Sequence, residues 1–284
     1  MARRLLSHLL ISLAVFSLTA MFFVWFIDGV LLNPNKLVPA LKDSGAISAV
    51  ATIIPEKAVQ DAKPSEQAEM KAKITSVVTP KYVENKLTTI TTSLTTFMRN
   101  GTPQPVLDLS DFPEQLKASG IEVGGDISKN FDKPIELNKD GKLDKVPQAY
   151  KIFKIVKYFG LLFCVVLLLT EWWVAARGEK LKRTGRIFMY TSLWFFIYWG
   201  TVIFIPSRVV PKLKEQFTDT SVNPLVDSIV KTVQKLFGSY ILTFAVFCGI
   251  IALILYLLRH GKKHVTKIQD VPTAKIRSQK VVSR

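Results

Sequence analysis

Two long apolar runs, Tyr158–Ala176 and Ile187–Ile205, are separated only by the basic stretch Arg177–Arg186. An α-helix rises about 1.5 Å per residue and the hydrocarbon core of a bilayer is about 30 Å thick, so about 20 apolar residues can cross it. Both runs are apolar on every face and lack the two-residue alternation of a barrel strand, and backbone in lipid must satisfy its own hydrogen bonds. They therefore predict two membrane-spanning helices joined by a short loop.

The joining loop predicts the orientation of this pair. Short loops rich in lysine and arginine are kept on the cytoplasmic side of a membrane. Glu179 is the one acid in the loop, whose basic residues are Arg177, Lys180, Lys182, Arg183 and Arg186. Trp172 and Trp173, at the end of the first run, suit the membrane interface. We therefore expect the pair to open toward the cytoplasm.

The N-terminal apolar stretch Leu5–Ile27 follows Arg3 and Arg4 and predicts a first span that stays as a signal anchor. The alternative is a removable signal peptide, which has an apolar region of about 7–15 residues and a small-x-small cleavage site. This stretch is longer, and Leu18 spoils the one candidate site. The anchor is the favoured interpretation.

Residues 33–150 form the one segment of globular size outside the spans, with equal numbers of basic and acidic residues. A segment of this size can bury its own core without disulfides. Its clearest signal is Thr79-Pro80, an N-cap followed by proline at the first helical position, ahead of a helix that should end at Asn100-Gly101. The apolar stripe of that helix is Val83, Leu87, Ile90, Leu94 and Phe97. The many intervening threonines leave a strand as the alternative.

The rest of this segment predicts a mostly α-helical domain with a small extended or hairpin element. Helices are expected over 65–78 and, as one or two pieces, over 36–54; Ser110 or Asp111 could cap another through Lys117. Val106–Leu109 suggests an extended piece, and 121–137 is broken by glycines and a proline. Asp140-Gly141 is interpreted as a hairpin turn, because the calcium-loop pattern fails at Pro147.

Glu171 is the one carboxylate inside a predicted span. The helix that carries it should start at 144–147, well outside the bilayer, so 151–176 is a stalk plus the second span. Intramembrane ionisable residues suggest function by default. However, Glu171 lies about two turns from the basic loop, so a structural role is favoured, in which it pairs with Arg177 or Lys180 or reaches the interface. Pairing within an oligomer and a proton or ion relay are the alternatives.

The segment 206–237 predicts an outer loop with an amphipathic helix that leads into a fourth span. Asn223-Pro224 can start this helix, since proline suits the first turn. Its apolar stripe is Leu225, Val226, Ile229, Val233 and Leu236. Such a stripe must lie on the membrane surface or pack against the domain of 33–150, and packing is our expectation.

The formal net charge of +16 is concentrated in the segments expected inside. It therefore reflects membrane topology, with anionic-lipid binding as an addition and nucleic-acid binding excluded. The tail, 259–284, lacks apolar periodicity and is expected to be disordered. The candidate contacts to anionic lipid are Lys180, Lys182, Arg183, Arg186, Arg259, Lys262 and Lys263.

No catalytic, cofactor or metal site is predicted. Cys164 and Cys248 both lie in spans, so neither a disulfide framework nor an external thiol is expected. His260 and His264 have the spacing of metal ligands on a helix but lack a third ligand, so they are interpreted as part of the basic tail.

The predicted fold is an α-helical integral membrane protein with four transmembrane helices and a mostly α-helical extracytoplasmic domain between spans 1 and 2. The predicted order is a cytoplasmic N-terminus (1–4), span 1 (5–27), the domain (33–150), stalk and span 2 (151–176), a basic loop (177–186), span 3 (187–205), an outer loop (206–237), span 4 (239–258) and a basic tail (259–284). We expect it in the plasma, or inner, membrane with both termini inside.

The function expected from this layout is that of a non-enzymatic envelope protein whose external domain binds a membrane or envelope protein, or a second copy, to assemble a complex. The layout also resembles that of mechanotransmission ABC permeases, which implies a transporter-associated subunit. The loop 177–186 is short for the coupling helix that such permeases need. A third alternative is a membrane enzyme that uses Asp108 and Asp111.

Overall fold

The computed structural model describes residues 2–60, 64–120, 134–176, 179–216 and 220–269, with side chains for all of these except 2–4, 64, 220 and 261–269. Within these ranges four helical segments are long and apolar enough to cross a membrane: Leu5–Leu31, Val146–Val174, Lys180–Gln216 and Asn223–His260. A bent pair, Pro34–Asp43 and Ala46–Ala58, passes the same test only if its two helices, which meet at 71°, count as one span. A mainly helical chain with four candidate spans is thereby confirmed.

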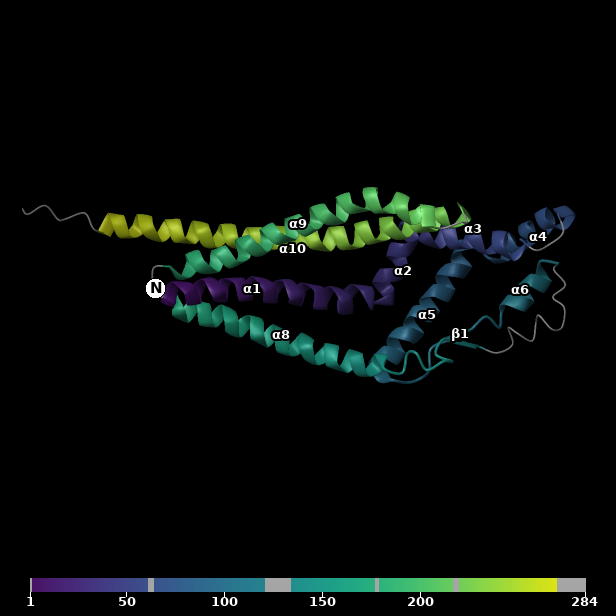
Figure 1. Ribbon diagram of the computed structural model, residues 1–284, viewed down its shortest axis with the longest axis horizontal. Helices are drawn as coiled ribbons and strands as arrows, with labels where there is room; N and C mark the ends of the chain where they lie inside the picture. The colour runs from purple at the N-terminus through teal and green to yellow at the C-terminus, as the bar shows by residue number, and fades with distance from the viewer. Residues whose placement is uncertain (1, 61–63, 121–133, 177–178, 217–219, 270–284) are drawn as a thin grey trace, which may run out of the picture.

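Four long helices form an elongated bundle at one end of the molecule (Figure 1). They are α1 (Ala2–Phe26), continued by the π-helical turn η1 (Ile27–Leu31), α8 (Val146–Val174), α9 (Lys180–Gln216) and α10 (Asn223–Gln269). α1 packs on α8 and α9 packs on α10, and contacts between α1 and α9 join the two pairs. Two apolar clusters hold the bundle together: Leu10, Ile11, Ala14, Val15, Leu167 and Ile187 near its free end, and Phe22, Phe26, Val30, Phe195, Ile241 and Ala245 near the head.

The helices of the bundle continue beyond the limits predicted from the apolar runs. α9 already starts at Lys180, inside the stretch expected as a loop, and passes Pro206 and Pro211 before it ends at Gln216. The segment 206–237, expected as an outer loop with an amphipathic helix from Asn223, is mainly helical. α9 is followed by a 3-10 turn, Thr220–Val222, and by α10, which begins at Asn223 as predicted. The long α9–α10 hairpin keeps these outer turns packed, which the local signals at Pro206 do not reveal.

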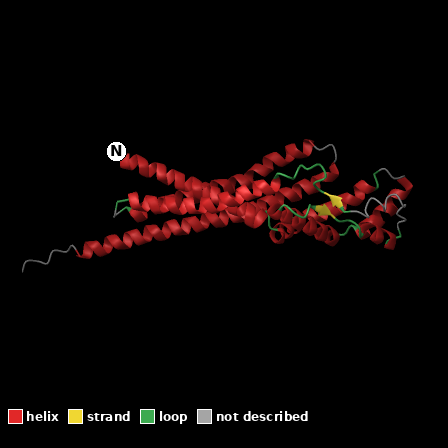
Figure 2. Ribbon diagram, turned by 90° about the horizontal axis from the view of Figure 1, so that it is seen from below, coloured by secondary structure: helices red, strands yellow, loops and turns green. Residues whose placement is uncertain are grey.

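α10 also extends further than expected at its other end. It runs to Gln269, so the first part of the tail predicted to be disordered is helical, and the remaining tail residues lie outside the described ranges. Figure 2 shows this end of α10 diverging from the N-terminal end of α1, while both strands lie in the head.

The head, residues 33–145, is mostly helical as predicted. Its elements are α2 (Pro34–Asp43), α3 (Ala46–Ala58), α4 (Pro64–Val77), α5 (Pro80–Asn100), β1 (Val106–Leu107), α6 (Phe112–Ala118) and β2 (Ile135–Glu136). Its core consists of Val38, Ile47, Ala51, Val59, Ile74, Val77, Val78, Val83 and Leu116. Because α2 and α3 contribute to this core, we assign the bent pair to the head rather than to the bundle.

α5 confirms the helix predicted after Thr79-Pro80. The Thr79 side chain accepts a hydrogen bond from the Tyr82 backbone N–H (3.2 Å), and Gly101 ends the helix in the left-handed region at φ 80°. The strand alternative is wrong. The hydroxyls of Thr88 and Thr91 donate to carbonyl oxygens four residues earlier, so threonine side chains are accommodated on the helix.

The extended element is also present, but its pairing differs from the prediction. β1 and β2 are antiparallel, with Val106 opposite Glu136 and Leu107 opposite Ile135. The prediction of a hairpin turn at Asp140-Gly141 is therefore wrong. Asn138 instead accepts a hydrogen bond from the Leu143 backbone N–H (2.7 Å), which builds a turn leading into α8. The expectation for 121–137 falls largely outside the described residues.

Candidate functional sites at the two ends of the bundle

Glu171 lies at the free end of the bundle in a buried cluster formed by three helices. Its side chain is 1% exposed. Its Oε1 accepts a hydrogen bond from Ser7 Oγ on α1 (2.9 Å) and lies 3.5 Å from Arg183 Nη1 on α9. Arg183 Nη2 also lies 2.8 Å from Glu179 Oε2. The cluster therefore ties α1, α8 and α9 together by charge as well as by packing.

The partner of Glu171 differs from the expected ones. Arg183 takes the place predicted for Arg177 or Lys180, because α9 begins early enough to point the end of its first turn at α8. Arg177 lies outside the described residues, and the Lys180 ammonium sits 5.5 Å from the centre of the Trp172 ring as a cation–π pair. The hydrogen bond and the charge of Arg183 lower the pKa of the Glu179 carboxyl, which lies at the start of the helix.

The basic residues predicted to contact anionic lipid do not share one environment. The side chain of Arg183 is 14% exposed and interacts with the carboxylates of Glu171 and Glu179. We therefore assign it a structural role in place of the predicted lipid contact. Lys182, Arg186 and Arg259 line a cavity between α9 and α10. Lys262 and Lys263 belong to α10, but their side chains are outside the part of the chain that is described.

A second polar cluster, at the head end of the bundle, was not predicted. Asp28, in the turn after α1, forms an ion pair with Lys157 and accepts a hydrogen bond from Tyr150 Oη (2.8 Å). Lys157 and Tyr150 both belong to α8, so the cluster joins the outer ends of α1 and α8. The sequence signal that could have found it is an acid and a lysine at the outer limits of successive spans.

α10 contacts the head through a polar face. Thr232 Oγ1 and Ser44 Oγ, in the turn between α2 and α3, are 2.5 Å apart, and Lys235 Nζ lies 3.1 Å from Asp43 Oδ2. A Cβ on Gly45 would lie 3.6 Å from Ser228 Oγ, so the head backbone approaches α10 closely at this place. Ser228, Thr232 and Lys235 recur at helical spacing and define the head-facing side of α10.

This contact corrects the predicted apolar packing face. Ile229 and Val233 are 45% and 46% exposed, so neither side chain is buried against the head. Leu225 and Val226 are half-buried, and Leu236 packs with the apolar cluster around Phe26. The expected coupling between α10 and the head exists, but it uses the small polar side chains beside the stripe, since these allow a closer approach of two helices.

The side chains considered for enzymatic chemistry have structural contacts. Asp111 pairs with Lys86 (2.5 Å) and accepts from Gln115 (3.0 Å), while Asp108 accepts the Ser110 backbone N–H (3.0 Å), which lowers the pKa of Asp108. Within the residues that the structure describes, no group of three or more His, Cys, Asp or Glu side chains could hold a metal ion.

Both cysteines lie in the bundle and are buried. The Cys164 thiol is 2.9 Å from the Ser17 hydroxyl, so it forms part of the contact between α8 and α1. Cys248 lies on α10.

These features define a multi-pass α-helical membrane protein in which four candidate spans carry a helical head. No protein-family model, curated protein or solved structure matches the chain.

Proposed function

We propose that the chain is a non-enzymatic protein of the plasma (inner) membrane whose head, within 33–150, lies outside and binds a membrane or envelope partner, or a second copy, to assemble a complex. Both chain termini are then cytoplasmic. The distribution of charge supports this orientation, because the free end of the bundle carries Lys180, Lys182, Arg186 and Arg259, whereas the head segment is neutral.

The observation that carries the proposal is the double attachment of the head to the spans. Asp28 with Lys157 fixes the ends of α1 and α8 where the chain enters and leaves the head. Ser44 and Asp43 fix the α2–α3 turn to α10. A head held at two separate places cannot rotate freely on linkers, so it presents a surface in a defined orientation, as an assembly protein requires.

Cysteine accessibility tests the orientation. The two native cysteines are buried in the bundle, so they give a low background with a membrane-impermeant maleimide. Lys81, exposed on the head, and Lys182, at the basic end, are each replaced by cysteine in separate variants. On intact cells we expect labelling of Lys81→Cys only, and labelling of both after permeabilisation. Labelling of Lys182→Cys alone on intact cells would reverse the topology.

Crosslinking tests the assembly role. A photo-crosslinker attached at Lys81→Cys should capture a discrete partner or a second copy, which then co-purifies in detergent. The matched control places the crosslinker at Arg208→Cys, an exposed position on α9 outside the head. Recovery of the protein alone and monomeric, from both variants, would refute the assembly function.

A transporter-associated role is the second candidate, and α10 is the observation that favours it. This helix contacts the head near Thr232 and continues to Gln269. From Asn223 it is about 70 Å long at 1.5 Å per residue, so one rigid rod connects the head to the basic end. Co-purification of an ATPase whose hydrolysis rate changes in the Asp43→Asn variant would favour this candidate. An unchanged rate, or no ATPase, would count against it.

A further inference from the structure

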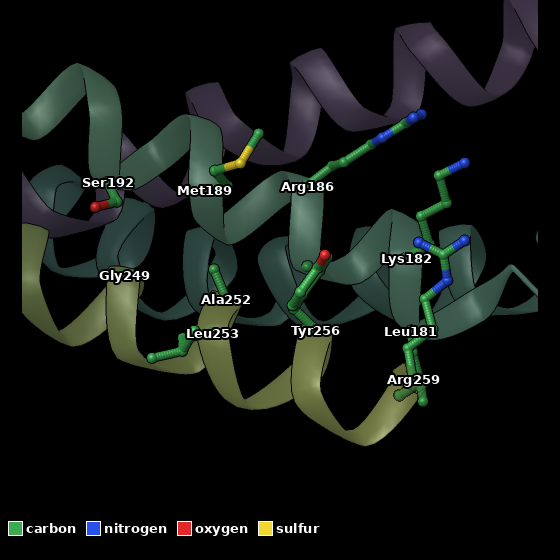
Figure 3. A pocket seen from close by; sticks show the side chains of 11 residues that line it. Leu181, Lys182, Arg186, Met189, Ser192, Gly249, Ala252, Leu253, Tyr256 and Arg259 are labelled. Carbon is green, nitrogen blue, oxygen red and sulfur yellow. The ribbon is translucent and has the colours of Figure 1, made fainter. Parts of the chain in front are cut away.

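A cavity of about 440 Å³ lies between α9 and α10 at the basic end of the bundle. Figure 1 shows the two helices lying farther apart toward this end. The lining residues come from one face of each helix, at spacings of three and four, and Figure 3 shows them from close by. The cavity is thus a groove that follows the helix axes.

Glycines form the floor of this groove. A Cβ on Gly249 would lie 3.2 Å from Ser192 Oγ, and a Cβ on Gly185 would lie 3.7 Å from Leu255 Cβ. The hydroxyl of Ser192 donates to the Ala245 carbonyl oxygen (2.8 Å), so its hydrogen bond is already used within the bundle. The floor therefore offers apolar surface, with Met189 and Leu253 along its length.

The mouth of the groove is cationic. In Figure 3 the Arg259 guanidinium extends from α10 toward the stem of Lys182 on α9, while the ammonium of Lys182 and the head group of Arg186 both point toward α1. Arg259 Nε is buried and has no hydrogen-bond partner among the residues with described side chains. Lys182 and Arg259 place two positive charges from different helices at one end of the groove, and Arg259 has an unused buried donor, which favours an anion at this end.

The length of the groove matches one leaflet of a membrane. From Lys182 to Ser192 the lining spans about 15 Å at 1.5 Å per residue, which is half of a hydrocarbon core of about 30 Å. An occupant with a charged group at the mouth and a chain along the floor would therefore have the dimensions of a lipid rather than those of a soluble ion.

We propose that this groove is a specific site for an anionic phospholipid, whose phosphate lies between Lys182 and Arg259 and one of whose acyl chains lies along the floor past Met189. The site adds to either proposed function, because a lipid bound there joins α9 and α10 where they diverge. It also fixes these helices against the leaflet on the basic side.

Native mass spectrometry of the full chain in detergent tests the site, with phosphatidylglycerol and phosphatidylcholine of equal acyl length as probes. We expect retention of phosphatidylglycerol in preference to phosphatidylcholine. Each cation is worth about a fivefold change in affinity, so Lys182→Gln/Arg259→Gln should weaken phosphatidylglycerol binding about 25-fold. The matched control, Arg208→Gln/Lys212→Gln, removes the same charge from the other end of α9 and should leave binding unchanged.

A second variant tests the acyl-chain part of the site without a change in charge. Leu253 is 57% exposed, so Leu253→Trp can be accommodated while it narrows the groove, and it should reduce phosphatidylglycerol retention in a protein of unchanged melting temperature. Equal retention of the two lipids would overturn the proposal, as would equal losses in the double variant and its control. Displacement of the lipid by inorganic phosphate alone would show that the mouth binds only a soluble anion and would also overturn it.

Discussion

In the buried cluster at Glu171, we expect the two members of the ion pair to differ in how much their replacement lowers stability. Arg183→Gln removes the one cation that the described residues place beside a carboxylate that is 1% exposed, and it leaves this carboxylate with the Ser7 hydroxyl as its remaining described partner. Removing one partner of a buried ion pair costs about 3–5 kcal/mol, because the other charge stays desolvated and unpaired. We therefore expect Arg183→Gln to lower the free energy of unfolding by about that amount.

The opposite substitution should be much milder. Glu171→Gln keeps an oxygen that can accept from Ser7, and Arg183 keeps Glu179 as a partner at 2.8 Å. The expected loss is about 1 kcal/mol, the net value of one hydrogen bond. The double variant Glu171→Gln/Arg183→Gln should be more stable than Arg183→Gln alone by about 2 kcal/mol, since no charge is then left buried.

The assay is equilibrium unfolding in mixed detergent micelles, with SDS as denaturant and tryptophan fluorescence as signal. Arg208→Gln, at an exposed position on the same helix, is the matched control and should change stability by no more than about 0.5 kcal/mol. An Arg183→Gln variant at least as stable as Glu171→Gln, or a double variant less stable than Arg183→Gln, would contradict this asymmetry.

Three further substitutions test the contacts that shape and attach the head. Thr79→Ala removes the side-chain acceptor for the Tyr82 N–H and should cost about 1 kcal/mol, measured by thermal melting, with Thr79→Ser close to wild type. Gly101→Ala should lower the free energy of unfolding by about 1–2 kcal/mol, because φ at this position is 80°. The added Cβ would lie 3.8 Å from Pro147 Cβ, an ordinary van der Waals contact, so the loss comes from the backbone conformation. An unchanged melting temperature would contradict this expectation. Asp28→Asn removes the charge beside Lys157 and should cost about 2 kcal/mol and speed proteolysis of the head, and a matching loss in Lys157→Gln that does not add to it would confirm the pair.

Local sequence signals were sufficient where neighbouring residues determine the structure. The cap at Thr79-Pro80 and the stop at Gly101 predicted α5 to the residue, because both signals act through hydrogen bonds and backbone angles within one turn. The start of α8 was found for the same reason, with Pro147 in its first turn. Where helices continue through packing, as α9 does past Pro206, local signals ended the element too early.

The contacts of Glu171 and of α10 with their partners could not be predicted from local sequence signals. The sequence marked Glu171 as unusual, but its partner depended on where α9 begins and how α1 lies beside α8. The stripe with Ile229 and Val233 was visible by spacing, yet the head contacts the polar face beside it. β1 pairs with β2, which lies almost 30 residues later in the sequence, so no local turn signal could predict this pairing.

Hydrophobic length and helix caps are local properties of the chain, so the sequence alone is sufficient to predict four apolar helices of membrane-spanning length and a helical head. The packing of the helices establishes which ionisable groups meet and which face of α10 contacts the head. It also decided where α9 and α10 part to leave a cationic groove. These contacts depend on how the helices are placed relative to one another. Buried charges and small side chains that are far apart in sequence interact only after the helices have packed.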